Sequence, residues 1–211
     1  MRVTVKICGL TNPADARAAV AAGADFVGFV FDPASRRCVG PAPAWIRGVA
    51  GAPRVGVFRN LGVEAVARAR EDAGLDLVQL HGDEPPEACA ALGGVARVIK
   101  AVPVSGAVDW AGVARYAGVA RILFDTASPR GGGTGRAFAW EALAGAPAGL
   151  EFWLAGGLTP ENAAAAVARL RPAGVDVASG VERPEGGKDA ARMRAFVAAV
   201  RAAARRLNSE E

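Results

Sequence analysis

The chain has 211 residues, of which 52% are hydrophobic and 22% are charged, so it is long enough and apolar enough to bury one core. Its net charge of +4 comes mostly from scattered arginines, with no block of like charges and no basic stripe interleaved with aromatics, which argues against nucleic-acid binding. An excess of arginine suits instead the binding of an anionic small molecule.

Short apolar runs alternate along the chain with alanine- and arginine-rich segments of helical period. We expect strands over residues 3–8, 26–31, 54–58, 77–81, 97–101, 121–125, 151–155 and 175–178. We expect helices over residues 13–21, 43–49, 63–73, 85–92, 109–116, 140–144, 160–170 and 189–206. Several of these helices begin at a proline, which suits a first helical turn. Strands that alternate with helices predict parallel pairing with helical crossovers.

A repeated glycine supports this order of elements. An Ala-Gly step precedes each even-numbered strand, at Gly23, Gly74, Gly118 and Gly174. In each step the glycine can end a helix in the left-handed conformation before the next strand begins. The steps recur at about every two strand–helix units, which a closed (βα)₈ TIM barrel explains better than an open sheet. We therefore expect a compact, single-domain barrel over residues 1–207 and a frayed polar tail at 208–211.

The cysteines and the histidine exclude several kinds of site. Cys8, Cys38 and Cys89 form neither a CxxC pair nor an even set for disulfides. With no signal-peptide pattern and no apolar run of membrane length, we expect a cytoplasmic protein that does not engage a membrane. His81 is the only histidine, which excludes a site that needs two imidazoles, and we expect no metal.

Catalytic groups of a TIM barrel gather at the C-terminal ends of its strands. Those ends carry Cys8, Asp32 with Arg36 and Arg37, Arg59, His81, Lys100, Asp125, Gly156 with Gly157, and Ser179 with Gly180. The glycine loops after strands seven and eight favour phosphate, because glycine lets backbone N–H groups approach an anion closely. The alternative is that these glycines only turn corners. His81 is a single histidine beside a turn, and we expect such a residue to be structural or to position a substrate.

Cys8 and Asp125 are the candidates for proton transfer. A thiol with an ordinary pKa of about 8.5 could act as a base or a nucleophile, or be a small buried hydrophobe. A carboxylate that ends an apolar strand is costly unless it is functional, paired or solvated. On strands one and six the two would face each other across the barrel mouth, which suits an isomerisation. Residues 126–135 include four glycines, so we expect a mobile loop that closes over a ligand.

These residues resemble the phosphoribosylanthranilate isomerase family. The matching segments are 6–11, 28–31, 35–37, 78–82, 124–126, 132–135, 155–162, 177–182 and 188–189. The resemblance implies that Cys8 is the general base, that Asp125 is the general acid and that Arg37 holds the anthranilate carboxylate. We also expect His81 to bind the substrate. Gly156, Gly157, Ser179 and Gly180 would form the phosphate site.

The reaction that the resemblance implies is an Amadori rearrangement of N-(5-phosphoribosyl)anthranilate, in tryptophan biosynthesis. It needs a phosphorylated small molecule and neither a metal nor an organic cofactor, and it leaves open whether the chain is a monomer or a homodimer. The chain departs from the family pattern at Arg36, Cys38, Ala139 and Ala178. Because Arg36 stands where proline is common, either Arg36 or Arg37 could reach the carboxylate.

Three other functions compete with this interpretation. An indole-glycerol-phosphate synthase would use a lysine at the barrel mouth, for which Lys100 is a possible match. A metal-dependent pentose-phosphate epimerase would need two histidines, which the chain lacks. A non-catalytic binding barrel would not require Cys8 opposite Asp125.

Overall fold

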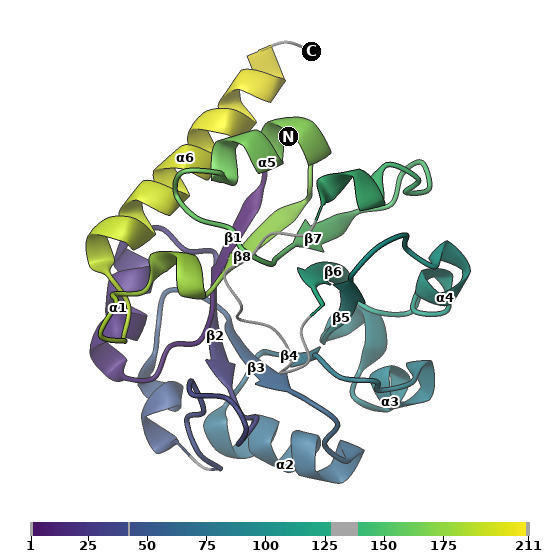
Figure 1. The fold of residues 1–211 in the computed structure, drawn as a ribbon. Coiled ribbons are helices and arrows are strands. Elements are labelled where there is room, and N and C mark those ends of the chain that lie inside the picture. The colour runs from purple at the N-terminus through teal and green to yellow at the C-terminus, as the bar shows by residue number, and fades with distance from the viewer. Residues whose placement is uncertain (1, 42, 128–138, 210–211) are drawn as a thin grey trace.

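Eight short, mostly apolar runs form the strands of a closed parallel barrel (Figure 1). The computed structural model describes residues 2–41, 43–127 and 139–209. The strands are β1 (Thr4–Ile7), β2 (Phe26–Val30), β3 (Arg54–Phe58), β4 (Leu77–Leu80), β5 (Val98–Val104), β6 (Arg121–Thr126), β7 (Phe152–Leu154) and β8 (Gly174–Val177). The barrel closes between β1 and β8, where Lys6 is in register with Asp176. The predicted TIM barrel is confirmed.

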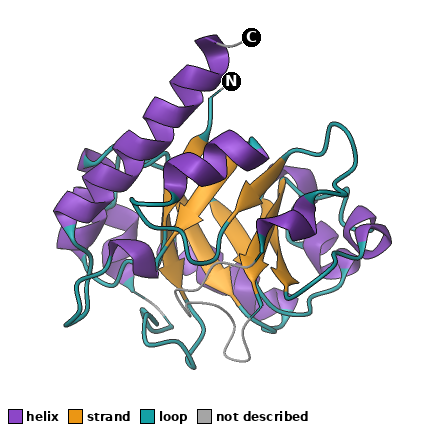
Figure 2. Ribbon diagram, turned by 45° about the horizontal axis from the view of Figure 1, so that its top comes forward, coloured by secondary structure: helices purple, strands orange, loops and turns teal. Residues whose placement is uncertain are grey.

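Helices surround the strands on the outside (Figure 2). The α-helices are α1 (Pro13–Ala21), α2 (Val63–Ala73), α3 (Pro86–Ala91), α4 (Trp110–Ala114), α5 (Ala163–Leu170) and α6 (Ala190–Ser209). Four 3₁₀ helices complete the described set: η1 (Ala44–Gly48), η2 (Gly94–Ala96), η3 (Trp140–Leu143) and η4 (Ser179–Val181). The long helix α6 packs against α1 and α5.

Two of the expected helices differ from the prediction. The segments expected at 43–49 and 140–144 form the 3₁₀ helices η1 and η3 in place of α-helices. Proline precedes η1 and glycine ends it, while Gly145 and Pro147 follow η3, so neither segment has the length or the residues to propagate an α-helix. Helix α6 continues to Ser209, so the first residues of the expected tail are helical, and residues 210–211 lie outside the described part.

The glycine repeat holds at two of its four positions. Gly23 and Gly74 have positive φ, at 92° and 62°, and follow α1 and α2 as expected. Gly118 and Gly174 do not have positive φ, and the left-handed residue at the end of α5 is Arg171. Gly174 lies inside β8, where a side chain would collide with the indole of Trp153. At that position glycine serves close packing and not a turn.

Apolar side chains fill both the space between strands and helices and the lower part of the barrel. The cluster inside the barrel consists of Val55, Leu77, Ile99, Ala101, Leu123, Trp153 and Ala155. At its edge, the Arg121 guanidinium lies 5.0 Å from the Trp153 ring and 5.1 Å from the Phe26 ring, which is cation–π geometry. The strands also carry the buried polar residues Lys6, Gln79 and Asp176, and Gln79 and Asp176 line a cavity together with Ala155 of this cluster.

The outer core generates a prediction about stability. Val200 of α6 is 0% exposed and Val95 is 68% exposed. The same valine-to-alanine change, made separately at each position, therefore compares a buried site with an exposed one. We expect Val200→Ala to lower the free energy of unfolding by about 2 kcal/mol, because it removes two buried carbon groups and leaves a cavity. Val95→Ala should change it by less than about 0.5 kcal/mol. Urea denaturation monitored by circular dichroism measures both values, and equal losses would contradict the packing assigned to α6.

Candidate active site

A cavity of about 370 Å³ opens at the C-terminal ends of the strands. Most of the predicted site residues line it: Cys8, Arg37, His81, Asp125, Gly156, Gly157 and Ser179. Gly180 borders an adjoining depression together with Ser179 and Arg192. The strand-end residues Asp32, Arg36 and Arg59 also line the main cavity. The structure thus brings the predicted residues to one place.

Cys8 directly follows β1 and faces the cavity while only 6% exposed. Its backbone N–H donates to the carbonyl of Val177 at 2.8 Å, which extends the pairing of β1 with β8 by one residue. Gly28 lies against the sulfur, and a β-carbon there would be 2.7 Å from Sγ. Burial raises the pKa of the Cys8 thiol, and the Lys6 ammonium opposes that shift. The Cys8 sulfur is therefore desolvated and lies next to a cation.

Lys6 and Asp176 form an ion pair inside the barrel, with Nζ 2.7 Å from Oδ2. Their side chains are 0% and 7% exposed. Burial alone would lower the pKa of Lys6, but Asp176 and Cys8 raise it above its ordinary value, so the ammonium stays charged. Asp176 Oδ1 is buried without a hydrogen-bond partner among the described residues, and Asp176 lines the cavity.

Asp125 lies near the end of β6 and is held by a chain of hydrogen bonds from β4. His81 Nε2 is 3.0 Å from Asp125 Oδ2, and His81 Nδ1 is 2.9 Å from Gln79 Nε2. When the Gln79 amide donates to Nδ1, the proton of the neutral ring is on Nε2 and faces Asp125. Gly156, after β7, leaves room for the carboxylate, since a β-carbon there would be 2.9 Å from Asp125 Oδ1.

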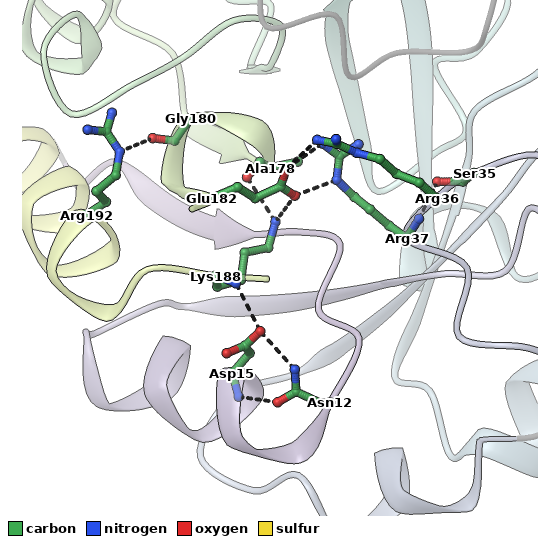
Figure 3. Close-up of polar contacts among 10 residues, drawn as sticks. All are labelled: Asn12, Asp15, Ser35, Arg36, Arg37, Ala178, Gly180, Glu182, Lys188 and Arg192. Carbon is green, nitrogen blue, oxygen red and sulfur yellow. Dashed lines mark hydrogen bonds and ion pairs between the residues drawn. The ribbon is translucent and has the colours of Figure 1, made fainter. Parts of the chain in front are cut away.

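Glu182 gathers three cations at the edge of the cavity, as Figure 3 shows. Arg37 donates through Nε at 2.6 Å and through a terminal nitrogen at 3.0 Å. Arg36 donates at 2.7 Å and Lys188 at 2.8 Å. Burial acts to raise the Glu182 pKa, but Arg37 and Lys188 outweigh it and hold that pKa at about 2. One carboxylate facing three cations leaves this wall positively charged, as an anion site requires.

A glycine and a helix cap fix where two of these cations lie. Gly9, with φ of 74°, lies under Arg37, and a side chain at Gly9 would collide with Arg37 Cδ. The side chain of Arg37 therefore packs against the backbone of Gly9, the residue that follows Cys8. Lys188 donates from its backbone to Asp15 at 3.0 Å, and Asn12 caps α1 by accepting from Asp15 at 2.8 Å (Figure 3). The start of α1 thus anchors the segment that carries Lys188.

The loops after β7 and β8 pack against each other. Gly156 and Gly157 have positive φ, at 83° and 65°, and Asn162 donates to the carbonyl of Gly157 at 2.9 Å. A side chain at Gly180 would collide with the carbonyl of Leu158, so only glycine permits this contact. Arg192 of α6 donates to the carbonyl of Gly180 at 3.0 Å (Figure 3). The two loops form one surface beside the cavity.

Lys100 does not reach the cavity. It is 3% exposed and its ammonium donates to Glu84 at 2.9 Å and to the carbonyl of Gly82 at 2.5 Å. Glu84 also accepts from the backbone of Asn60 at 2.8 Å. Lys100 is therefore a structural ion-pair residue, which removes the residue that the synthase alternative needed at the barrel mouth.

Three polar residues of the site were missed by the sequence analysis. Lys6, Gln79 and Asp176 lie inside strands, whereas the analysis searched strand ends. Lys6 precedes Cys8 by two positions and Gln79 precedes His81 by two, and side chains two apart share a face of a strand. That alternation is the signal that could have found two of them.

The expected mobile loop at 126–135 cannot be compared with the structure beyond its first residues. Residues 128–138 lie outside the described part, and with them the segment 132–135. In the part of the chain that the structure describes, no group of three or more His, Cys, Asp or Glu residues could hold a metal ion. No described helix is long and apolar enough to cross a bilayer.

Comparisons with known proteins match this geometry to one family. The family model of N-(5'-phosphoribosyl)anthranilate (PRA) isomerase matches residues 5–199. The chain is 49% identical over 215 aligned residues to an N-(5'-phosphoribosyl)anthranilate isomerase of Afipia carboxidovorans, covering 96% of this chain and 91% of the relative. It is 46% identical over 199 residues to that of Pelobacter propionicus, covering 92% and 94%.

Solved structures give the same match. Phosphoribosyl anthranilate isomerase of Thermotoga maritima superposes with a TM-score of 0.86 at 39% identity, covering 95% of this chain and 100% of that chain. A second isomerase structure, with a TM-score of 0.82, 37% identity and the same coverage, is a complex with reduced 1-(o-carboxyphenylamino)-1-deoxyribulose 5-phosphate.

The cation cluster generates a prediction about pH. The pKa of Glu182 falls from 4.5 to about 2 on folding, so its ion pairs stabilise the folded state above pH 4.5 and are lost as the pH falls through 2. The Glu182→Gln variant lacks this stabilisation by ion pairs at every pH. We expect wild type to exceed the variant in unfolding free energy by on the order of 2–3 kcal/mol near neutral pH, and the gap to narrow below about pH 4.

Urea denaturation of both proteins at a series of pH values measures this gap. Carboxylates that the two proteins share cancel in the difference, so the gap reports on Glu182. A gap that stays constant down to about pH 3 would contradict the assignment.

Proposed function

The chain belongs to the N-(5'-phosphoribosyl)anthranilate isomerase family, and we propose that Cys8 and Asp125 perform the reaction of that family in this protein as general base and general acid. The protein is an isomerase of tryptophan biosynthesis that converts N-(5-phosphoribosyl)anthranilate to 1-(2-carboxyphenylamino)-1-deoxyribulose 5-phosphate. The observation that carries the proposal is that both side chains line one cavity, from strands that β7 and β8 separate.

The proposed reaction proceeds in two proton transfers. Asp125, in its protonated form, donates to the ring oxygen of the furanose, and the ring opens to a Schiff base. Cys8, as thiolate, then removes the proton from C2′, and the resulting enolamine tautomerises to the ketone. A thiol held inside the barrel and next to Lys6 suits a base that exchanges a proton. No covalent bond between sulfur and sugar is required.

His81 is proposed to orient the acid. Its ring is hydrogen-bonded on both sides, to Gln79 and to Asp125, so rotation of the imidazole or of the carboxyl group would break a contact. Because His81 also lines the cavity, it stays within reach of the substrate. The arrangement supports a positioning role near the ring oxygen more than a separate proton transfer.

The two anionic groups of the substrate are proposed to bind at opposite sides of Cys8. The carboxylate binds at Arg37, whose guanidinium is 12% exposed at the positively charged wall. The phosphate binds at Gly156, Gly157, Ser179 and Gly180, whose loops form one surface where backbone N–H groups can approach an anion. A substrate spanning both sites places its sugar over Cys8 and Asp125.

All of these residues come from one chain, and we propose residues 1–207 as the domain that carries the complete site. A monomer and a homodimer would each hold complete sites. The three cysteines are free, which suits a reducing compartment, and we propose the cytoplasm.

Removing either proposed proton-transfer group should strongly lower turnover. We expect Cys8→Ala and Asp125→Ala each to lower kcat by roughly 10²–10⁴-fold, because each loses one general acid–base step. The measurement is the loss of phosphoribosylanthranilate fluorescence with purified protein. Cys89→Ala and Asp72→Ala make the same changes at a buried thiol and an exposed carboxylate away from the cavity, and should keep near wild-type rates. Full activity in Cys8→Ala or Asp125→Ala would overturn the role given to that residue.

Equal substitutions at the two adjacent arginines should separate their roles. Arg37 is 12% exposed and Arg36 is 71% exposed, so a charge-assisted contact from Arg37 is worth more. We expect Arg37→Gln to raise KM by roughly 10–100-fold and Arg36→Gln by less than about 5-fold. Steady-state kinetics give both values. A larger rise in Arg36→Gln would transfer the carboxylate contact to Arg36.

A further inference from the structure

Lys6 is a buried cation to which the proposed reaction assigns no proton transfer. It is 0% exposed, and it lies on the same face of β1 as Cys8, two positions earlier. A buried ammonium is costly unless it is paired, and Asp176 Oδ2 at 2.7 Å supplies the pair. Two apolar side chains in place of Lys6 and Asp176 would close the barrel with a smaller desolvation cost. We therefore expect the buried lysine to have a role beyond the pairing of β1 with β8.

The second neighbour of Lys6 is the Cys8 sulfur. The point where a Gly28 side chain would begin is 2.7 Å from Cys8 Sγ and 3.0 Å from Lys6 Cε. Glycine at position 28 therefore lets the lysine chain and the sulfur converge on one spot beside β2. The Lys6 ammonium is electrostatically coupled to Cys8 as well as ion-paired with Asp176, so two groups that can be anionic share one cation.

The other charged groups around Cys8 are committed elsewhere. Lys188 and Arg37 also interact electrostatically with Cys8, but both are ion-paired to Glu182. Asp176 opposes ionisation of the thiol, because it is an anion near the same site. Across the cavity, His81 and Asp125 are hydrogen-bonded to each other. Among these cations, Lys6 opposes the rise in the Cys8 pKa most strongly.

We propose that Lys6 is a positioning residue that stabilises the thiolate of Cys8, and that Asp176 limits this effect by competing for the same ammonium. When Cys8 is a thiol, Lys6 and Asp176 form a neutral buried pair. When Cys8 is ionised, the ammonium lies between two anions and compensates both in part. The inference rests on the proposed role of Cys8 as the base.

The two substitutions should shift the thiol in opposite directions. Lys6→Met removes the cation while keeping an unbranched side chain of similar length, and Asp176→Asn removes the anion while keeping its shape. We expect the apparent pKa of Cys8 to rise by about one unit or more in Lys6→Met and to fall below the wild-type value in Asp176→Asn. A role in packing alone would not produce opposite shifts.

The measurement is the rate of alkylation of Cys8 by iodoacetamide as a function of pH. Peptide mass spectrometry separates Cys8 from Cys38 and Cys89, so the natural cysteines can stay in place. The midpoint of the rate profile gives the thiol pKa without reference to turnover. The activity of Lys6→Met should recover in part as the pH is raised, since more of the thiol then ionises. An unchanged alkylation midpoint in Lys6→Met, or shifts of the same sign in both variants, would overturn the proposal.

Lys6→Met leaves Asp176 buried without its cation, which can prevent folding. The double variant Lys6→Met/Asp176→Asn removes both charges, so it leaves no unpaired buried carboxylate and can be measured if Lys6→Met does not fold. Its alkylation midpoint should lie above that of Asp176→Asn, and equal midpoints would overturn the proposal. The result also separates the two hypotheses: an active Cys8→Ala would refute the role of Cys8 itself. If Cys8→Ala is inactive but the Cys8 alkylation midpoint is unchanged by the substitutions at Lys6, only the role of Lys6 is refuted.

Discussion

The seam between β1 and β8 is the constraint on which the site depends, because the barrel closes and the reactive sulfur is placed at the same pair of strands. Lys6 and Asp176 are in register across this seam and are ion-paired at 2.7 Å. One residue further along, the backbone of Cys8 donates to Val177. Closure therefore sets where the sulfur lies relative to the ion pair and keeps all three side chains largely buried. Any change that opened the seam would expose the pair and move the proposed base.

The two proposed proton-transfer groups are kept in different electrostatic surroundings. On the side of β1 and β8, Lys6, Arg37 and Lys188 make the wall around Cys8 cationic. On the side of β4 and β6, Asp125 contacts the single imidazole of His81. These cations favour the ionised form of the Cys8 thiol, although burial outweighs them and raises its pKa. The cavity therefore presents the two side chains proposed for proton transfer in two different settings.

Much of the fold follows from local sequence, and much of the site does not. Residues 54–58 form a strand, and residues 13–21 and 63–73 form helices, with the predicted bounds, because β-branched runs and proline or glycine boundaries are local signals. Strand ends located Cys8, His81 and Asp125 for the same reason. The Glu182 cluster joins Arg36 and Arg37 to a residue about 145 positions away, and no local pattern encodes that contact. Lys6 and Asp176 lie inside two strands that are far apart in the sequence. Their ion pair can be recognised only when the barrel closure that brings these strands together is known.

The glycines of the site illustrate why a sequence motif and its physical cause can differ. Read as a motif, glycines after strands indicate loops that cradle phosphate. In the structure, Gly28 faces Cys8 and Gly156 faces Asp125, and at each position a β-carbon would come within 3.0 Å of the functional side chain. Gly9 does the same for Arg37. Interiors pack too tightly to accept such an added carbon without moving its neighbour. Part of the glycine pattern in this chain therefore encodes where the proposed base, acid and carboxylate-binding arginine fit, in addition to any backbone contact with an anion.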